Sequence, residues 1–242
     1  MLDQEIDIRT RDGVMNTFVT HPEERGPHPV VLFFMDAPGK REELHDMARR
    51  IGTAGCYVML PNLYYRSVRE FDATDDLAGR AGEVRRLIAT LDFGKIANDT
   101  TALLGHAAGD RHAAATAVGI VGYCMSGPFA YAMAGTFPER VAAAASIHGV
   151  RLHGEGSPQA LAGNVRGELY FACAELDEFV PAGMVDDLEQ HLSALDVHAR
   201  VERYPGVHHG FVFPTRAGAY DKAACERHYE RLFDLFGRNL QR

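Results

Sequence analysis

The stretch from Gly119 to Gly127 constrains the fold of this chain more than any other. It begins with an apolar run typical of a buried strand, passes through a Gly-x-Cys-x-x-Gly turn around Cys124, and is followed by Pro128, which suits a first helical turn. A side chain at the apex of such a strand–turn–helix elbow has a strained backbone, so its neighbours must be small. The turn therefore predicts Cys124 as a nucleophile presented above a sheet edge.

The elbow also predicts a favourable electrostatic setting for Cys124. Unpaired N–H groups at the start of the following helix carry partial positive charge, which stabilises a thiolate or an oxyanion. Alternatively, a cysteine in this place is a small buried hydrophobic residue. The other cysteines, Cys56, Cys173 and Cys225, lie in strand-like or helix-like runs, and no CxxC pair indicates a zinc or redox motif.

The composition excludes several classes of partner. With 242 residues and a formal net charge of −8, the chain can bury a full core and is unsuited to nucleic acid or an anionic membrane. Its acidic first residues lack the apolar core of a signal peptide, and apolar runs such as 30–35 are too short to span a bilayer. We therefore expect a cytoplasmic protein, a monomer or small homo-oligomer, with a single domain over residues 1–242.

Strand-like and helix-like segments alternate along the chain after an initial hairpin. This alternation predicts a mostly parallel sheet with helices on both faces and an antiparallel hairpin at its N-terminal end, an α/β fold. The predicted strands are 4–9, 14–20, 30–35, 57–60, 118–123, 141–148, 168–174 and 197–204. The predicted helices are 41–54, 84–91, 98–114, the elbow helix that ends at Pro138, 182–194 and 219–235.

Five reactive residues directly follow predicted strands. In a parallel sheet the active site lies beyond the carboxyl ends of the strands, so these positions can converge. They are Asp36, Cys124, His148, Asp177 and His209. The order Cys124, Asp177, His209 is also the order nucleophile–acid–histidine of a hydrolase triad.

The predicted triad assigns one role to each member. The imidazole of His209 takes the thiol proton, the carboxylate of Asp177 orients the ring, and backbone N–H groups of Met125 and Ala37 hold the oxyanion. Rivals remain at two of the positions. Glu175 and Glu178 compete for the acid role, and His208 competes with His209, which we favour because Gly210-Phe211 follows it directly. Ser126 is a less suitable nucleophile, since it lies two residues past the apex.

With these residues the chain resembles the dienelactone hydrolase family. The matching motifs span nearly the whole chain in the family's order: Pro61-Asn62-Leu63-Tyr64-Tyr65-Arg66, Gly122-Tyr123-Cys124-Met125-Ser126-Gly127, Asp177-Glu178-Phe179-Val180-Pro181 and His209-Gly210-Phe211. The resemblance implies an α/β-hydrolase fold, a Cys124–His209–Asp177 triad, and cleavage of an enol-lactone or related small ester without a cofactor.

Three departures from the family pattern qualify what the resemblance implies. Asp36 stands where the family has a Glu that interacts with the resting nucleophile. Asp36 keeps the charge of that Glu but is one methylene shorter, so we expect it to have a weaker role in activating Cys124. Ser126 stands where the family often has Gly. Phe213 stands where a dienelactone hydrolase has an Arg for the substrate carboxylate, which implies weaker binding of that group.

Several other residues are candidates for contact with the substrate. Tyr64 and Arg66 are equally compatible with a packed aromatic corner, and His148 with a hydrogen-bonded structural role. Phe179 and Phe211 adjoin the triad acid and histidine, and Arg80, Arg85 or Arg86 could pair with a substrate anion. Neither HExxH nor a zinc-type Cys/His spacing is present, so we expect no metal. The alternative to an enzyme is a non-catalytic binding or regulatory protein on the same fold.

Overall fold

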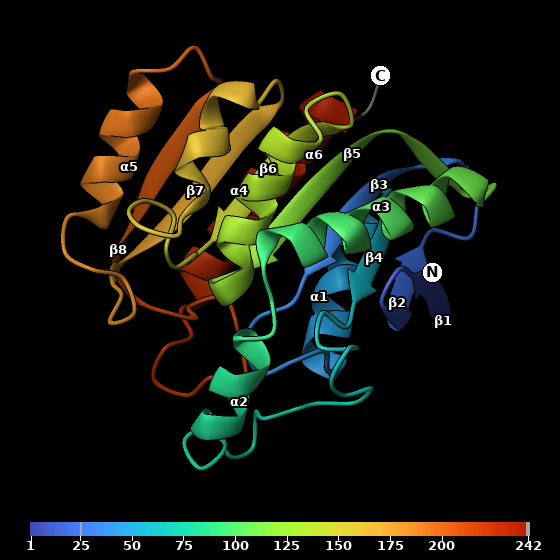
Figure 1. The fold of residues 1–242 in the computed structure, drawn as a ribbon, viewed down its shortest axis with the longest axis horizontal. Coiled ribbons are helices and arrows are strands. Elements are labelled where there is room, and N and C mark those ends of the chain that lie inside the picture. The colour runs from blue at the N-terminus through green and yellow to red at the C-terminus, as the bar shows by residue number, and fades with distance from the viewer. Residues whose placement is uncertain (25, 241–242) are drawn as a thin grey trace. The chain divides into compact units, whose positions relative to one another are not determined.

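The computed structural model describes residues 1–24 and 26–240. The chain divides into two compact units, Met1–Val118 and Gly119–Arg242. Figure 1 shows the ribbon coloured along the chain, with the first unit in blue to green and the second in green to red. No helix in the described part of the chain is both long and apolar enough to cross a membrane.

The first unit contains four strands, in the order β1-β2-β4-β3. They are β1 (Leu2–Thr10), β2 (Gly13–His21), β3 (His28–Phe34) and β4 (Tyr57–Pro61). β1 and β2 form an antiparallel hairpin, β2 also pairs antiparallel with β4, and β3 pairs parallel with β4. β3 is apolar and almost wholly buried along its length, as expected of a strand covered on both faces.

Three helices complete the first unit: α1 (Glu42–Thr53), α2 (Ala81–Ile88) and α3 (Phe93–Gly109). α1 has Glu42 and Glu43 in its first turn and Arg50 in its last, which complements the helix dipole, and its apolar face packs on β2 and β4. α3 packs on β1. It begins where the side chain of Asp92 accepts a hydrogen bond from the backbone N–H of Lys95, a regular N-cap.

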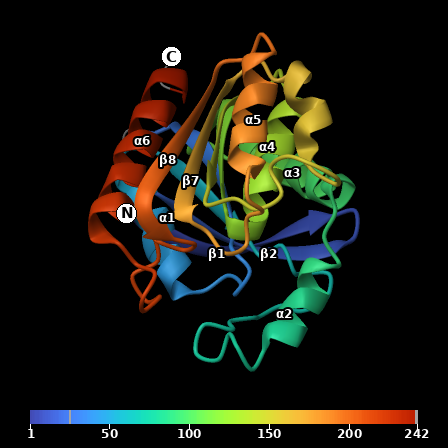
Figure 2. The ribbon, with the colours of Figure 1, turned by 90° about the vertical axis from the view of Figure 1, so that its left-hand side faces the viewer.

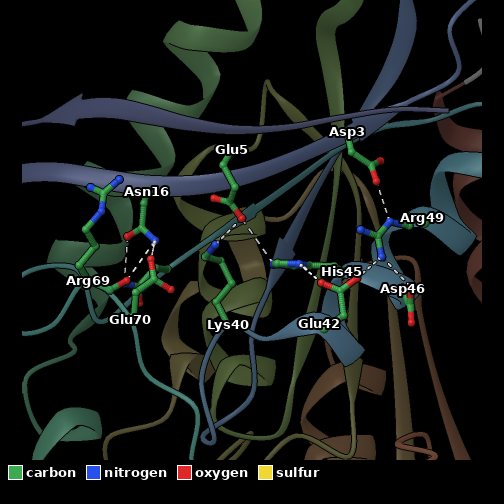
Figure 3. Close-up of polar contacts among 11 residues, drawn as sticks. Asp3, Glu5, Asn16, Lys40, Glu42, His45, Asp46, Arg49, Arg69 and Glu70 are labelled. Carbon is green, nitrogen blue, oxygen red and sulfur yellow. Dashed lines mark hydrogen bonds and ion pairs between the residues drawn. The ribbon is translucent and has the colours of Figure 1, made fainter.

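Charged pairs link β1 to α1 and to the loop before it, as Figure 3 shows. Arg49 donates to Asp3 at 2.7 Å, and Lys40 donates to Glu5 at 2.6 Å, with His45 3.6 Å from the same Glu5 carboxylate. The Arg49–Asp3 pair lies at the surface, and surface pairs contribute only about 0.2–1 kcal/mol each. Burial of the apolar face of α1, at roughly 1.5–3 kcal/mol for each fully buried Leu or Ile, is the larger contribution to stability.

The second unit contains the end of β5 (Ala113–Tyr123) and three strands in the parallel order β6-β7-β8. These strands are β6 (Val141–Ile147), β7 (Glu168–Leu176) and β8 (Ala199–His208). The helices are the 3₁₀ turn η1 (Cys124–Ser126), α4 (Gly127–Thr136), η2 (Pro158–Asn164), α5 (Met184–Ser193) and α6 (Lys222–Leu240). Figure 2 shows α6 on one side of these strands and α4 and α5 on the other. α4 is buried all round, which matches its uniformly apolar sequence.

The predicted fold class is confirmed, while several boundaries differ. The helix predicted over 98–114 begins at Phe93 and ends at Gly109, because Asp92 caps it earlier and the alanines from Ala113 onward already belong to β5. β8 continues through Pro205 to His208. Proline is tolerated there because β8 is at the end of the strand order, where one row of backbone groups lacks a ladder partner. The turn η2 was not predicted, and the single domain over residues 1–242 stays a prediction.

Candidate active site

Cys124 occupies the elbow that the sequence predicts. It follows β5 directly and has a backbone φ of 55°, in the left-handed region that non-glycine residues rarely adopt. A Cβ on Gly122 would lie 2.1 Å from the carbonyl oxygen of Ser126, and a Cβ on Gly127 would lie 2.3 Å from Oγ of Ser146. The turn therefore closes only with glycine at both positions.

The loop after β6 packs against this elbow. The backbone N–H of Val150 donates to the carbonyl oxygen of Cys124 at 3.3 Å. His148 and Arg151 in the same loop have φ values of 38° and 49°. With Cys124 they are the three non-glycine residues of positive φ in ranges 1–24 and 26–240. Such conformations cost on the order of 1–3 kcal/mol each and cluster at functional sites, which marks this region as the candidate site.

The carboxylate of Asp177 orients the ring of His209. Asp177 follows β7 and His209 follows β8, and Nδ1 of His209 lies 2.8 Å from Oδ2 of Asp177. The other carboxylate oxygen accepts the backbone N–H of Phe179 at 3.0 Å. Since a carboxylate only accepts hydrogen bonds, Nδ1 carries the proton, and Nε2 is the atom left to exchange a proton with a substrate or a thiol. His208, the rival, is exposed.

The two buried histidines of the site have opposite pKa shifts. Burial lowers the pKa of His209, but hydrogen bonds to Asp177 and Cys124 and the charges of those groups outweigh it and raise the pKa. Nε2 of His209 has no partner at full hydrogen-bond geometry among the described residues, so the resting contact with Cys124 is a loose one, as is common before substrate binds. Burial and the neighbouring His209 lower the pKa of His148 well below its usual value.

Aromatic rings surround these two histidines. The ring of His148 lies 4.7 Å from that of His209 and 5.7 Å from that of Phe211, in both cases edge to face. The ring of Phe179 lies 4.8 Å from His209 on another side and is 63% exposed. The second unit thus brings together six of the predicted site residues: Cys124, Asp177, His209, His148, Phe179 and Phe211.

Three other predicted site residues, Asp36, Ala37 and Tyr64, lie in the first unit. Asp36 is fully buried and accepts a hydrogen bond from Nη1 of Arg41 at 2.5 Å. Burial lowers the pKa of Arg41, but the charges of Asp36 and Glu43 outweigh it and raise the pKa. The hydroxyl of Tyr64 donates to the carbonyl oxygen of Ala37 at 3.0 Å. Sequence reasoning missed Arg41, whose spacing of five residues from Asp36 carries no motif.

Arg66 is engaged by two carboxylates. Its guanidinium donates to both oxygens of the buried Asp99, at 2.7 and 2.9 Å, and to Asp12 at 2.7 Å. The hydroxyl of Tyr65 donates to the same Asp99 carboxylate at 2.8 Å. This network joins the β1–β2 turn to α3. The carboxylates of Asp99 and Asp12 balance the positive charge of Arg66 within the first unit. Contact of Arg66 with a substrate stays a prediction.

Phe213, which replaces the family's Arg, is fully buried. Its ring lies 5.4 Å from His148, and the guanidinium carbon of Arg216 lies 4.8 Å from the ring centroid. Two hollows of about 200 and 300 Å³ flank the loop that follows Asp177, and neither is lined by Cys124 or His209 in the described part of the chain. The candidate site therefore lies at Cys124, His209 and Asp177 rather than in either hollow. Within the same described part, no group of three His, Cys, Asp or Glu side chains could hold a metal ion.

A comparison of the sequence with protein-family models identifies the family of this chain. The model described as "Dienelactone hydrolase family" matches residues 15–240. The chain belongs to the dienelactone hydrolase family. It is therefore a hydrolase of that family, with the α/β-hydrolase fold.

Individual members of the dienelactone hydrolase family match over nearly the full chain. A protein of Synechocystis sp. named "Putative carboxymethylenebutenolidase" is 26% identical over 230 residues, which cover 93% of this chain and 92% of that protein. The solved structure titled "Putative Dienelactone Hydrolase" from Klebsiella pneumoniae has a TM-score of 0.87 at 21% identity and covers 98% of both chains. The dienelactone hydrolase from Anabaena variabilis has a TM-score of 0.70 at 17% identity, covering 99% of this chain and 98% of its own.

The Asp177–His209 pair predicts a shifted titration. In Asp177→Asn the pKa of His209, read by NMR as the midpoint of its pH titration, should fall, because the carboxylate that favours the imidazolium is gone. Glu178→Gln, which removes an exposed acid next door, is the control and should leave the midpoint unchanged. In the wild type the raised pKa adds stability that is fully present below about pH 6.5 and is lost as the pH rises through the folded-state pKa. Equal midpoints in wild type and Asp177→Asn would contradict this coupling.

The Arg66 network predicts a loss of stability. Arg66→Met removes the charged partner of the buried Asp99, so the free energy of unfolding measured in urea should fall by about 3–5 kcal/mol. Arg69→Met is the matched control, since Arg69 and its partner Asp7 are exposed, and should cost less than about 1 kcal/mol. If Arg66→Met is as stable as the control and raises KM instead, Arg66 binds substrate.

Proposed function

We propose that the protein hydrolyses a small carboxylic ester or lactone through a Cys124–His209–Asp177 triad and an acyl-enzyme intermediate. The observation that carries the proposal is the pairing of His209 with Asp177 at 2.8 Å beside a cysteine at the apex of a strained elbow. The raised pKa of His209 supports it, because an imidazolium next to a thiolate is the activated state of a cysteine nucleophile.

The reaction has two steps. The thiolate of Cys124 attacks the carbonyl carbon, a C–S bond forms, and the carbonyl electrons move to the oxygen. When the electrons return, the C–O bond breaks and the imidazolium of His209 gives its proton to the leaving alkoxide or enolate. Water then attacks the thioester while His209 takes a proton from it. The C–S bond breaks, and the acid is released with the thiolate restored.

Other residues take supporting roles in this proposal. The backbone N–H groups of Met125 and Ala37 stabilise the oxyanion, and Asp36 adjusts the activation of Cys124. Phe179 offers an exposed ring beside His209 for an apolar part of the substrate. Tyr64 and Phe211 are both fully buried, so their side chains would reach a substrate only if neighbouring groups moved.

Hydrolysis that depends on Cys124 is the decisive test. In a screen of small esters and lactones, Cys124→Ala should lower kcat by at least about a thousandfold, since triad members act as a unit. Ser126→Ala is the matched control and should retain activity, because it removes only the rival hydroxyl of the same turn. Asp36→Asn should alter the rate at which iodoacetamide alkylates Cys124. Absence of hydrolysis by the wild type across the screen would favour the non-catalytic binding protein instead.

The substrate is expected to be a neutral lactone rather than dienelactone itself. The curated relative of Synechocystis is named as a carboxymethylenebutenolidase, yet in this chain Phe213 stands where the family has a carboxylate-binding Arg. Loss of one charged contact costs roughly 1.5–3 kcal/mol, about ten- to a hundredfold in binding. We expect kcat/KM for a neutral enol-lactone of similar size to exceed that for dienelactone. The reverse preference would show that another cation replaces the missing Arg.

A further inference from the structure

His148 is enclosed at the centre of an aromatic cluster. It follows β6 directly, is 1% exposed, and is surrounded by the rings of Tyr123, Phe211, Phe213 and His209 at centroid distances of 4.7 to 6.2 Å. Neither of its ring nitrogens has a hydrogen-bond partner among the described residues. Buried polar groups nearly always find partners, so an imidazole in this state requires an explanation.

The backbone of His148 is held in an unusual conformation. Its φ is 38°, and its N–H donates to the carbonyl oxygen of Ala172 in β7 at 2.7 Å. Histidine is one of the few side chains that is enriched at positive φ, which makes it a suitable residue where both a ring and a left-handed backbone are needed.

The groups that face His148 keep its ring uncharged. Besides its burial, His209, Arg216 of the loop after β8, and His228 of α6 each disfavour a second positive charge there. Tyr123, Phe211 and Phe213 offer no carboxylate to compensate. Because the His148 ring is disfavoured as a cation, a proton taken up by the two rings binds to His209, whose pKa is raised by Asp177 and Cys124.

We propose that His148 is a positioning residue for His209. The ring of His209 makes edge-to-face contacts with His148 at 4.7 Å and with Phe179 at 4.8 Å, while its Nδ1 lies 2.8 Å from the carboxylate of Asp177. A hydrogen bond at one nitrogen leaves the ring free to swing about that contact. Two edge-to-face neighbours stop this motion and keep Nε2 directed toward Cys124.

This proposal rests on the function proposed for Cys124 and His209, and it replaces substrate contact as the role of His148. A ring that is fully buried and that makes no hydrogen bond within the described residues acts through its shape. Removal of the ring should therefore lower kcat and leave KM nearly unchanged. An aromatic ring without nitrogens should be able to take its place.

The experiment compares a substitution that removes the ring with one that keeps a ring. His148→Asn removes the ring and tolerates the left-handed backbone, so it is the variant most able to fold. His148→Phe keeps a ring of similar size and has no titratable group. We expect kcat to fall about a hundredfold in His148→Asn, the usual effect of a misplaced catalytic group, and to stay near the wild-type value in His148→Phe, with KM little changed in both.

A second measurement does not depend on activity. The proton on Nδ1 of His209 that is shared with Asp177 should give a downfield NMR resonance in the wild type and in His148→Phe, and it should broaden in His148→Asn. The proposal fails if His148→Asn keeps both kcat and the sharp resonance, if His148→Phe has the wild-type unfolding midpoint in urea and is still as impaired as His148→Asn, or if KM alone rises. A wild type without Cys124-dependent hydrolysis would refute the proposed function, while the NMR comparison would still decide whether His148 positions His209.

Discussion

The close approach of two backbones shapes the turn at Cys124. A Cβ on Gly127 would lie 2.6 Å from Cα of Gly149, and a Cβ on Gly149 would lie 3.2 Å from Cα of Gly127. Because neither residue has a side chain, the start of α4 and the loop after β6 can meet directly. That contact lets Val150 hydrogen-bond to the carbonyl oxygen of Cys124 and supports a φ of 55° at the cysteine. The strained backbone at Cys124 thus depends on this packing constraint.

The Asp177–His209 pair differs from the carboxylate–arginine pairs elsewhere in the described part of the molecule. Asp99 is matched by Arg66, Asp36 is matched by Arg41, and Glu202 is surrounded by Arg200, Arg227 and Arg231. In these networks the arginine charge is permanent, so the pairs are structural. Asp177 instead faces a histidine, whose charge depends on a proton that can be exchanged. This is the arrangement that allows acid–base chemistry rather than stability alone.

Much of this site could be predicted from the sequence because its positions are tied to local patterns. The glycines at 122 and 127 mark the elbow, and the ends of the apolar runs place Asp177 and His209 at one edge of a parallel sheet. The partners that come from side-chain packing could not be predicted. The Arg41–Asp36 pair has no motif, and the engagement of Arg66 by Asp99 joins residues 33 positions apart. Helix α3 was misplaced because an alanine-rich segment fits a helix and a buried strand equally well until neighbours decide.

The contrast between His148 and His209 shows what the sequence could and could not predict. Chain order and the Gly-Phe that follows His209 single it out as the predicted triad histidine, but nothing in the sequence shows that the two buried rings lie 4.7 Å apart. Asp177 and Cys124 raise the pKa of His209, whereas burial among rings, with His209, Arg216 and His228 as its charged neighbours, lowers the pKa of His148. A proton placed on one ring makes a proton on the other less favourable. The two residues therefore form one electrostatic unit, in which protonation of His209 is favoured and protonation of His148 is disfavoured.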